Sequence, residues 1–215
     1  MIRSLKNNLF VLLILLVGCK SQPIELSLPF INKPDFTPEW IEKDDPAYLS
    51  IHRIPAFSFT DQDGKTVTEN TVAGKIYVAD FIFTRCGSIC PKMTANMNII
   101  QSAFKNNDEV MLLSHTVTPE MDSVPVLKKY AEAKGIISGK WHLLTGNENA
   151  IYSLAKKQYF ADDTIGYYQT GNEFLHTENF ILVDKQRRIR GVYNGTLPVE
   201  AQRLVDDINT LLKED

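Results

Sequence analysis

The stretch "KIYVADFIFTRCGSICPKMT", Lys75–Thr94, carries the pattern from which the rest of the chain can be interpreted. Its first nine residues are a nearly continuous run of β-branched and aromatic side chains, typical of a central strand covered on both faces. Two cysteines follow, Cys86 and Cys90, and then Pro91, whose missing N–H is tolerated in the first turn of a helix. The stretch therefore predicts a buried strand, a loop with two thiols, and a helix.

Outward from this stretch, strand patterns and helix patterns alternate. Upstream, Ile54–Thr68 alternates apolar and polar residues around the turn signal Asp63-Gly64 and predicts a hairpin. The downstream patterns predict, in order, a strand at Glu109–Val117, a helix at Ser123–Gly135 capped by Ser123, a strand in Trp141–Gly146, a helix in Asn147–Gln158, two strands in Asn179–Gly195 and a helix ending near Leu212.

This order predicts an α/β fold with a central mixed sheet flanked by helices and an N-terminal hairpin. Alternating strands and helices favour right-handed crossovers and parallel strands, and the closing pair of strands adds an antiparallel edge. Ligand chemistry in such folds lies at the carboxyl ends of the parallel strands. Cys86 and Cys90 follow one of those ends.

The N-terminus has the pattern of a secretion signal. Arg3 and Lys6 precede a short apolar run, Leu9–Val17, and then Gly18 and Cys19. The letters "LVGC" resemble a bacterial lipoprotein box, which implies removal of residues 1–18, acylation of Cys19, and a lipid-anchored protein in the cell envelope outside the cytoplasm. An uncleaved signal anchor is the alternative interpretation.

Residues 19–50 are rich in proline and charge, and we interpret them as a tether plus a segment that docks on the domain formed by residues 51–215. Phe36 and Trp40 are expected to pack on that domain, although Trp40 could instead stack on a ligand. Without the leader, 21 Lys and Arg face 26 Asp and Glu, a net charge near −5. No basic patch stands out, so nothing favours nucleic-acid binding.

The two remaining cysteines have several possible uses. A thiol at a helix N-terminus has its thiolate stabilised by the helix dipole and the free N–H groups. If the helical turn includes both, Cys86 and Cys90 share one face and could bind one metal ion or form a disulfide. A purely structural disulfide closes too small a loop to stabilise a domain much.

The other soft ligands are histidines and methionines. His176, in "FLHTENFILVD", precedes a predicted strand in the loop expected to face Cys86 and Cys90; two thiolates and one imidazole form a site that suits copper. A surface histidine is the alternative. His115 and His142 lie in predicted strands and are interpreted as packed or surface residues. The helical spacing of Met93 and Met97 favours a core position over copper binding.

Taken together, "FIFTRCGSICPKMTANM", "SHTVTPEMDSVPVLKKYA", "WHLLTG" and "HTENFILVD" resemble the Sco/SenC family over roughly Ile54 to Leu212. The resemblance implies a thioredoxin-like fold, copper binding outside the cytoplasm, and help in assembling the binuclear copper centre of cytochrome c oxidase. Carried over, the copper ligands, for Cu(I) or Cu(II), are Cys86, Cys90 and His176. The implied partner is the oxidase subunit that carries the binuclear site.

One position departs from the family pattern. The family often has Asp where this chain has Thr118, in "VTPEMD". Asp122 is a candidate replacement close to the metal. Asp80, in the strand before the cysteines, is either a second buried carboxylate near the metal or an edge-facing residue. Such neighbours tune metal affinity and ligand orientation.

Two functions other than copper delivery compete. In a thiol–disulfide oxidoreductase, Cys86 would attack and Cys90 would resolve, with a thiol reductant as a further partner. This enzymatic activity could coexist with copper delivery. Two features count against a general oxidoreductase: the cysteine spacing is not C-x-x-C, and the segment "HTENF" has no proline where thioredoxins place a cis-proline before the strand that faces the thiols. A peroxiredoxin-like peroxidase has less support, because Phe83 stands three residues before Cys86 in place of threonine.

Overall fold

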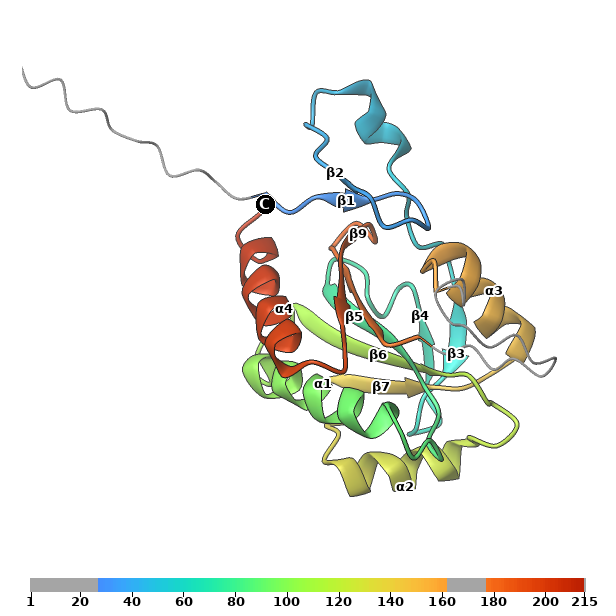
Figure 1. The fold of residues 1–215 in the computed structure, drawn as a ribbon. Helices are drawn as coiled ribbons and strands as arrows, with labels where there is room; N and C mark the ends of the chain where they lie inside the picture. Colours follow the sequence, from blue (N-terminus) through green and yellow to red (C-terminus); the bar gives the residue numbers. More distant parts are fainter. Residues whose placement is uncertain (1–26, 162–176, 215) are drawn as a thin grey trace, which may run out of the picture.

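The computed structural model describes residues 27–161 and 177–214 (Figure 1). The elements are β1 (Phe30–Ile31), β2 (Pro38–Glu39), the 3-10 helix η1 (Pro46–Ser50), β3 (Ser58–Thr60), β4 (Thr66–Thr68), β5 (Ile76–Ile82), α1 (Cys90–Phe104), β6 (Val110–Thr116), α2 (Val124–Lys134), β7 (Trp141–Leu144), α3 (Glu148–Gln158), β8 (Asn179–Val183), β9 (Ile189–Asn194) and α4 (Pro198–Leu211).

The β5 strand lies at the centre of a sheet with the order β7-β6-β5-β8-β9. All seven of its residues are buried, as a strand covered on both faces requires. It pairs in parallel with β6 and antiparallel with β8, so the predicted mixed sheet with an antiparallel edge is confirmed. The predicted N-terminal hairpin is also confirmed, as β3 paired with β4.

Alternate residues of β5 serve two hydrophobic cores. Tyr77, Ala79 and Phe81 face the core that includes β3 and α3. Val78 and Ile82 face the core built with α1, α2 and α4, where Met93 and Met97 are fully buried. Figure 1 shows these three helices on one side of the sheet and α3 with the hairpin on the other. The two-residue period of a strand thus gives a three-layer α/β domain.

The segment before the hairpin, residues 27–50, is called the strap here. Its β1 and β2 strands pair with each other, and η1 follows (Figure 1). Phe36 packs against the core as expected. The expectation for Trp40 was wrong: its side chain is 64% exposed, and its indole N–H donates to the Ser27 carbonyl oxygen rather than entering the core.

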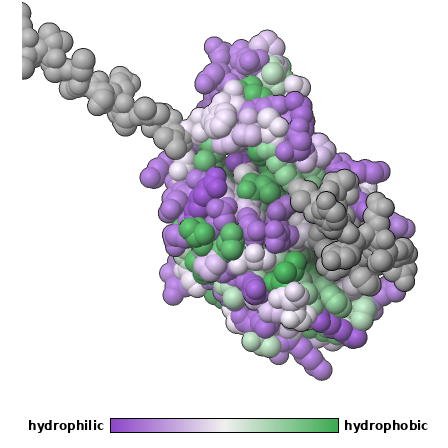
Figure 2. All heavy atoms as spheres, viewed as in Figure 1, coloured by the Kyte–Doolittle hydropathy of each residue, from purple (hydrophilic) through white to green (hydrophobic). Residues whose placement is uncertain are grey.

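The surface in Figure 2 is mainly hydrophilic, with hydrophobic residues in separate spots rather than one broad patch. Across residues 27–161 and 177–214, no helix has both the length and the apolar character needed to cross a membrane.

Candidate thiol and metal site

The two cysteines lie where β5 passes into α1. The helix begins at Cys90, with Pro91 in its first turn, so Cys86 lies in the preceding loop. The helical turn therefore does not include both thiols, and the condition for their sharing one helical face is not met. The Cys86 N–H donates to the Phe83 carbonyl oxygen at 3.1 Å, and the Ser88 N–H approaches the Cys86 Sγ atom at 3.4 Å. This local folding turns the Cys86 sulfur toward the open N–H groups of the helix.

The two thiols differ in exposure and acidity. Both are free rather than joined in a disulfide; Cys86 is half-buried and Cys90 is buried. Burial raises the pKa of Cys86, but hydrogen bonds from the Cys90 and Ser88 N–H groups and from the Cys90 thiol outweigh it, so its pKa lies below the ordinary value. Burial raises the pKa of Cys90 to about 12. Cys86 is therefore the more accessible and the more acidic thiol of the pair.

Asp80 is a buried carboxyl close to Cys90. Its side chain is fully buried, so of the two alternatives for this residue the edge-facing position is wrong. One oxygen accepts from the Ser114 hydroxyl, which in turn accepts from the Trp141 indole N–H at 2.8 Å; the other oxygen has no hydrogen-bond partner. Burial raises the pKa of Asp80 to about 7, and its charge contributes to the raised pKa of Cys90.

Asp122 connects the loop after β6 to the end of β5. Its carboxylate accepts from the hydroxyls of Thr84, Thr116 at 2.5 Å and Thr118 at 3.1 Å, and it has no exposed surface. Thr84 lies two residues before Cys86, so Asp122 fixes the chain just ahead of the first thiol. Thr118 is a neutral donor to this carboxylate, whereas an aspartate there would set a second negative charge against it.

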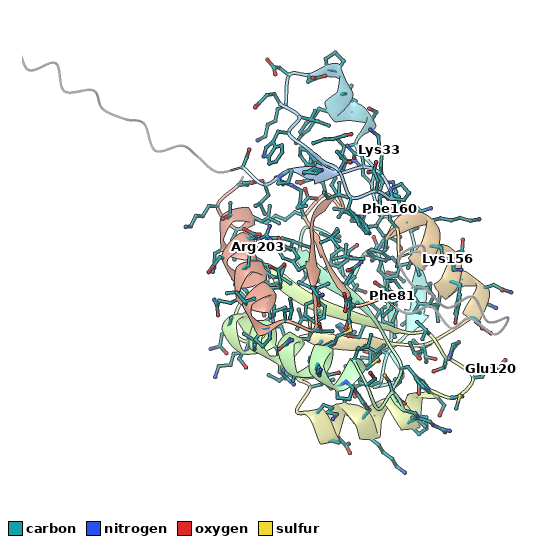
Figure 3. The ribbon with its side chains drawn as sticks, in the orientation of Figure 1. Lys33, Phe81, Glu120, Lys156, Phe160 and Arg203 are labelled. Carbon is teal, nitrogen blue, oxygen red and sulfur yellow. The ribbon has the colours of Figure 1, made fainter. Side chains whose placement is uncertain are left out.

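Sequence reasoning missed Thr84 and Thr116 as partners of Asp122. The residues are separated by 38 positions in one case and six in the other. The only available signal was the position of Thr84 next to the cysteine loop. Glu120, in the same loop as Asp122, is exposed at the edge of the molecule (Figure 3).

The predicted third ligand, His176, lies outside the described residues, as does Cys19. Of the described histidines, His115 and His142 are buried, as expected, and His52 bonds the Gln158 carbonyl oxygen. Within residues 27–161 and 177–214, no group of three or more His, Cys, Asp and Glu side chains could hold a metal ion. Cys86 and Cys90 are two soft sulfur donors, the ligand type that suits copper.

The β8 strand shows which part of the chain arrives at this site. It runs antiparallel to β5, with Ile181 opposite Ala79 and Val183 opposite Tyr77. The chain that enters β8 at Asn179 therefore comes in at the carboxyl end of β5, beside the cysteine loop. The Thr177 hydroxyl oxygen accepts from the Asn179 N–H at 3.2 Å, so Thr177 also lies at the start of β8.

Comparison with known proteins gives a consistent result. The family model described as SCO1/SenC matches residues 49–213. A SCO1/SenC family lipoprotein from Bacillus anthracis is 29% identical, with a TM-score of 0.66, over 75% of this chain and 96% of that one. BsSco, described as a member of the Sco family of cytochrome c oxidase assembly proteins with a disulfide switch, is 32% identical, with a TM-score of 0.63, over 75% and 94%.

A structure of Arabidopsis thaliana ScoI with copper bound is 25% identical, with a TM-score of 0.57, over 75% of this chain and 98% of that one. The predicted fold class, with its thioredoxin-like neighbours, is confirmed.

Proposed function

Because the chain belongs to the SCO1/SenC family, we propose that it is a copper chaperone that binds copper through Cys86, Cys90 and His176 and delivers it to the binuclear copper centre of a cytochrome c oxidase. The observation that carries this proposal is the pair of free thiols where β5 passes into α1, at the end of the sheet where β8 begins three residues after His176. The copper-bound Arabidopsis relative and the oxidase-assembly role of BsSco support the metal and the partner.

The two thiols would contribute unequally to metal capture. Cys86 is half-buried with a lowered pKa, so it would give up its proton to an incoming copper ion more readily than an ordinary cysteine. Cys90 holds its proton more tightly and would release it as the metal binds, which makes uptake favour higher pH. Asp122 would keep the Cys86 loop in place through Thr84. Release would proceed by ligand exchange with soft ligands on the oxidase subunit.

The proposed location is the outer side of a membrane, with acylated Cys19 as the anchor and residues 19–50 linking it to the domain. The "LVGC" pattern supports this location, and so does the Bacillus anthracis relative, which is described as a lipoprotein. Delivery would therefore take place between two proteins held at the same membrane.

The test is an anaerobic copper titration of reduced residues 22–215. We expect one copper per chain, an intense sulfur-to-Cu(II) absorption band, and weaker binding after Cys86→Ala or His176→Ala. His52→Ala is the matched control, because this histidine bonds the Gln158 carbonyl oxygen on α3 and should leave the copper band unchanged. Absence of stoichiometric binding would contradict the proposal.

Thiol–disulfide exchange is a second candidate, favoured by the unequal acidity of the two thiols. The Cys86 thiolate would bond to one sulfur of a partner disulfide and release the other as a thiolate. Cys90, after losing its proton, would then bond to Cys86 and release the partner fully reduced. The cysteine pair supplies the two electrons and ends as a disulfide, which a thiol reductant must reduce again.

The two functions can act in sequence, because a recipient copper site must be reduced before it accepts metal. The description of a disulfide switch in BsSco fits this alternative. Measuring the reduction potential of the Cys86–Cys90 pair with and without copper separates the two: a readily reducible pair that does not bind copper would leave exchange as the activity.

A further inference from the structure

The strap packs against the end of the sheet where β5 and β9 begin. The Arg188 and Arg190 guanidinium groups lie 4.7 Å and 4.4 Å from the centre of the Phe30 ring. Arg190 also donates to the Pro29 carbonyl oxygen at 3.0 Å and to Glu214 at 2.7 Å. The place where the described chain begins is therefore fixed relative to the sheet.

Trp40 lies at that starting point with most of its surface uncovered. Its indole N–H bonds the Ser27 carbonyl oxygen at 3.2 Å, yet the side chain remains 64% exposed. It borders a groove of about 920 Å³ between the strap and the end of α4, where Ser27, Ile41 and Thr210 also contribute. A large aromatic side chain held at the surface, with its polar edge satisfied, is typical of residues at a membrane interface.

The chain length between the lipid and Trp40 is short. Seven residues separate Cys19 from Ser27, so an acylated Cys19 can be at most about 28 Å from Ser27 even if that segment is fully extended. The groove beside Trp40 is therefore the part of the domain that the anchor holds nearest the bilayer. Its charged groups have both signs and so favour no lipid charge: Lys43, Lys185, Lys213, Arg188 and Arg190 against Glu42, Asp44, Asp184 and Glu214.

We propose that the groove face around Trp40 rests on the lipid bilayer, with Trp40 in the interface, and that the thiols point away from the membrane. This inference rests on the lipid anchor of the proposed function. The β5 strand begins at Ile76, which lines the groove, and ends at Ile82 before Cys86. Seven residues of strand put about 20 Å between the groove and the thiol loop. The recipient copper site must then project from the membrane into the aqueous phase.

The test uses the full acylated chain in phosphatidylcholine vesicles, prepared with or without bromine on the acyl chains. Bromine quenches tryptophan fluorescence at contact. The sequence has two tryptophans, and Trp141 is 1% exposed in the core, so quenching reports Trp40. We expect brominated lipid to remove up to about half of the emission of the natural chain and none of the emission of Trp40→Phe.

Flotation of the vesicles, measured on the same sample, reports the anchor separately. Equal emission in both kinds of vesicle, for a chain that floats with them, would overturn the inference and leave the anchor and copper delivery standing. Emission that depends on protein density but not on bromination would place a second copy of the chain on Trp40 and also overturn it. A chain that does not float would refute the anchor and the inference together, while the copper band still tests metal binding.

Discussion

The two ends of β5 differ in how their buried polar groups are paired. Near its amino end, Asp184 forms ion pairs with Arg188 and Arg190, and Arg190 also pairs with Glu214. Further along, Asp80 on β5 and His115 on β6 have polar atoms without a hydrogen-bond partner. One oxygen of Asp80 and both ring nitrogens of His115 make no hydrogen bond. Paired charges fix geometry, whereas unpartnered polar groups cost stability. The charged groups at the strap end are therefore positioned by their partners, whereas the unpartnered polar atoms of Asp80 and His115 reduce stability further along the sheet. Of these two residues, Asp80 is the one whose charge reaches Cys90.

The largest expected effect comes from removing one of the paired charges near the amino end of β5. Arg190→Ala removes a guanidinium that is 3% exposed and leaves Asp184 and Glu214 without it, so it should lower the free energy of unfolding by about 3–5 kcal/mol. Urea denaturation measures this loss, and the copper band should be unchanged. Arg203→Ala, with 63% of the side chain exposed, is the control and should cost less than about 1 kcal/mol. Equal losses of unfolding free energy in the two variants would show that the buried ion pairs near the amino end of β5 contribute no more than an exposed one.

The second expected effect concerns both the stability of the protein and its copper affinity, because Asp122 bonds the residue Thr84 just before the thiol loop. Asp122→Ala leaves the hydroxyls of Thr84, Thr116 and Thr118 without their shared acceptor and should cost about 2–3 kcal/mol. Because Thr84 precedes Cys86, copper affinity should also fall by about 10- to 100-fold in the titration. Asp122→Asn keeps one acceptor oxygen and should recover part of both losses. Unchanged copper affinity in Asp122→Ala would show that the loop does not need this carboxylate.

The third effect depends on pH. Burial lowers the pKa of His115 to about 3, so the unfolded chain takes up the proton first as pH falls. The contribution of His115 to stability is thus complete above its unfolded pKa, near 6.5, and decreases as pH drops toward 3; at pH 5 the loss from this group is about 2 kcal/mol. His115→Phe should remove this loss, because Phe57, Phe59 and Phe81 already surround the ring. Equal pH dependence in both chains, measured by urea denaturation from pH 7 to 4, would be the contrary result.

The smallest effect concerns which sulfur atoms bind copper. Met93 is fully buried in the core that α1 shares with the sheet. Met93→Leu nearly conserves volume and should change the free energy of unfolding by less than about 1.5 kcal/mol, with an unchanged copper stoichiometry and absorption band. A shifted sulfur-to-Cu(II) absorption band would show that Met93 is a copper ligand and that the metal site includes part of α1.

Much of the fold could be predicted because it depends on patterns within short stretches. The β-branched run before Cys86 predicts β5, and Met93, Met97, Ile100 and Phe104 predict the buried face of α1. Both predictions are local, since the period of buried residues identifies the element.

The parts that could not be predicted depend on contacts between distant segments. Asp122 and Thr84 meet only because β5 and β6 are neighbours in the sheet, and neither residue signals the other. Trp40 looked like a core residue by composition, but its neighbour is Ser27. Ser123 is at the predicted cap position of α2, yet its side chain makes no capping hydrogen bond. His176 as a ligand stays a prediction.

The bond from the Leu28 N–H to Glu214, at 3.1 Å, sets the beginning of the strap beside the residues that follow α4, so the strap and the domain together begin and end at one place. A domain whose ends meet can be spliced into a surface loop of another protein without being pulled apart, because the host chain enters and leaves at one place. The thiol loop would then project from the far side of such a chimera. The same adjacency makes the last turn of α4 a poor place for a purification tag, since a tag there would crowd the strap.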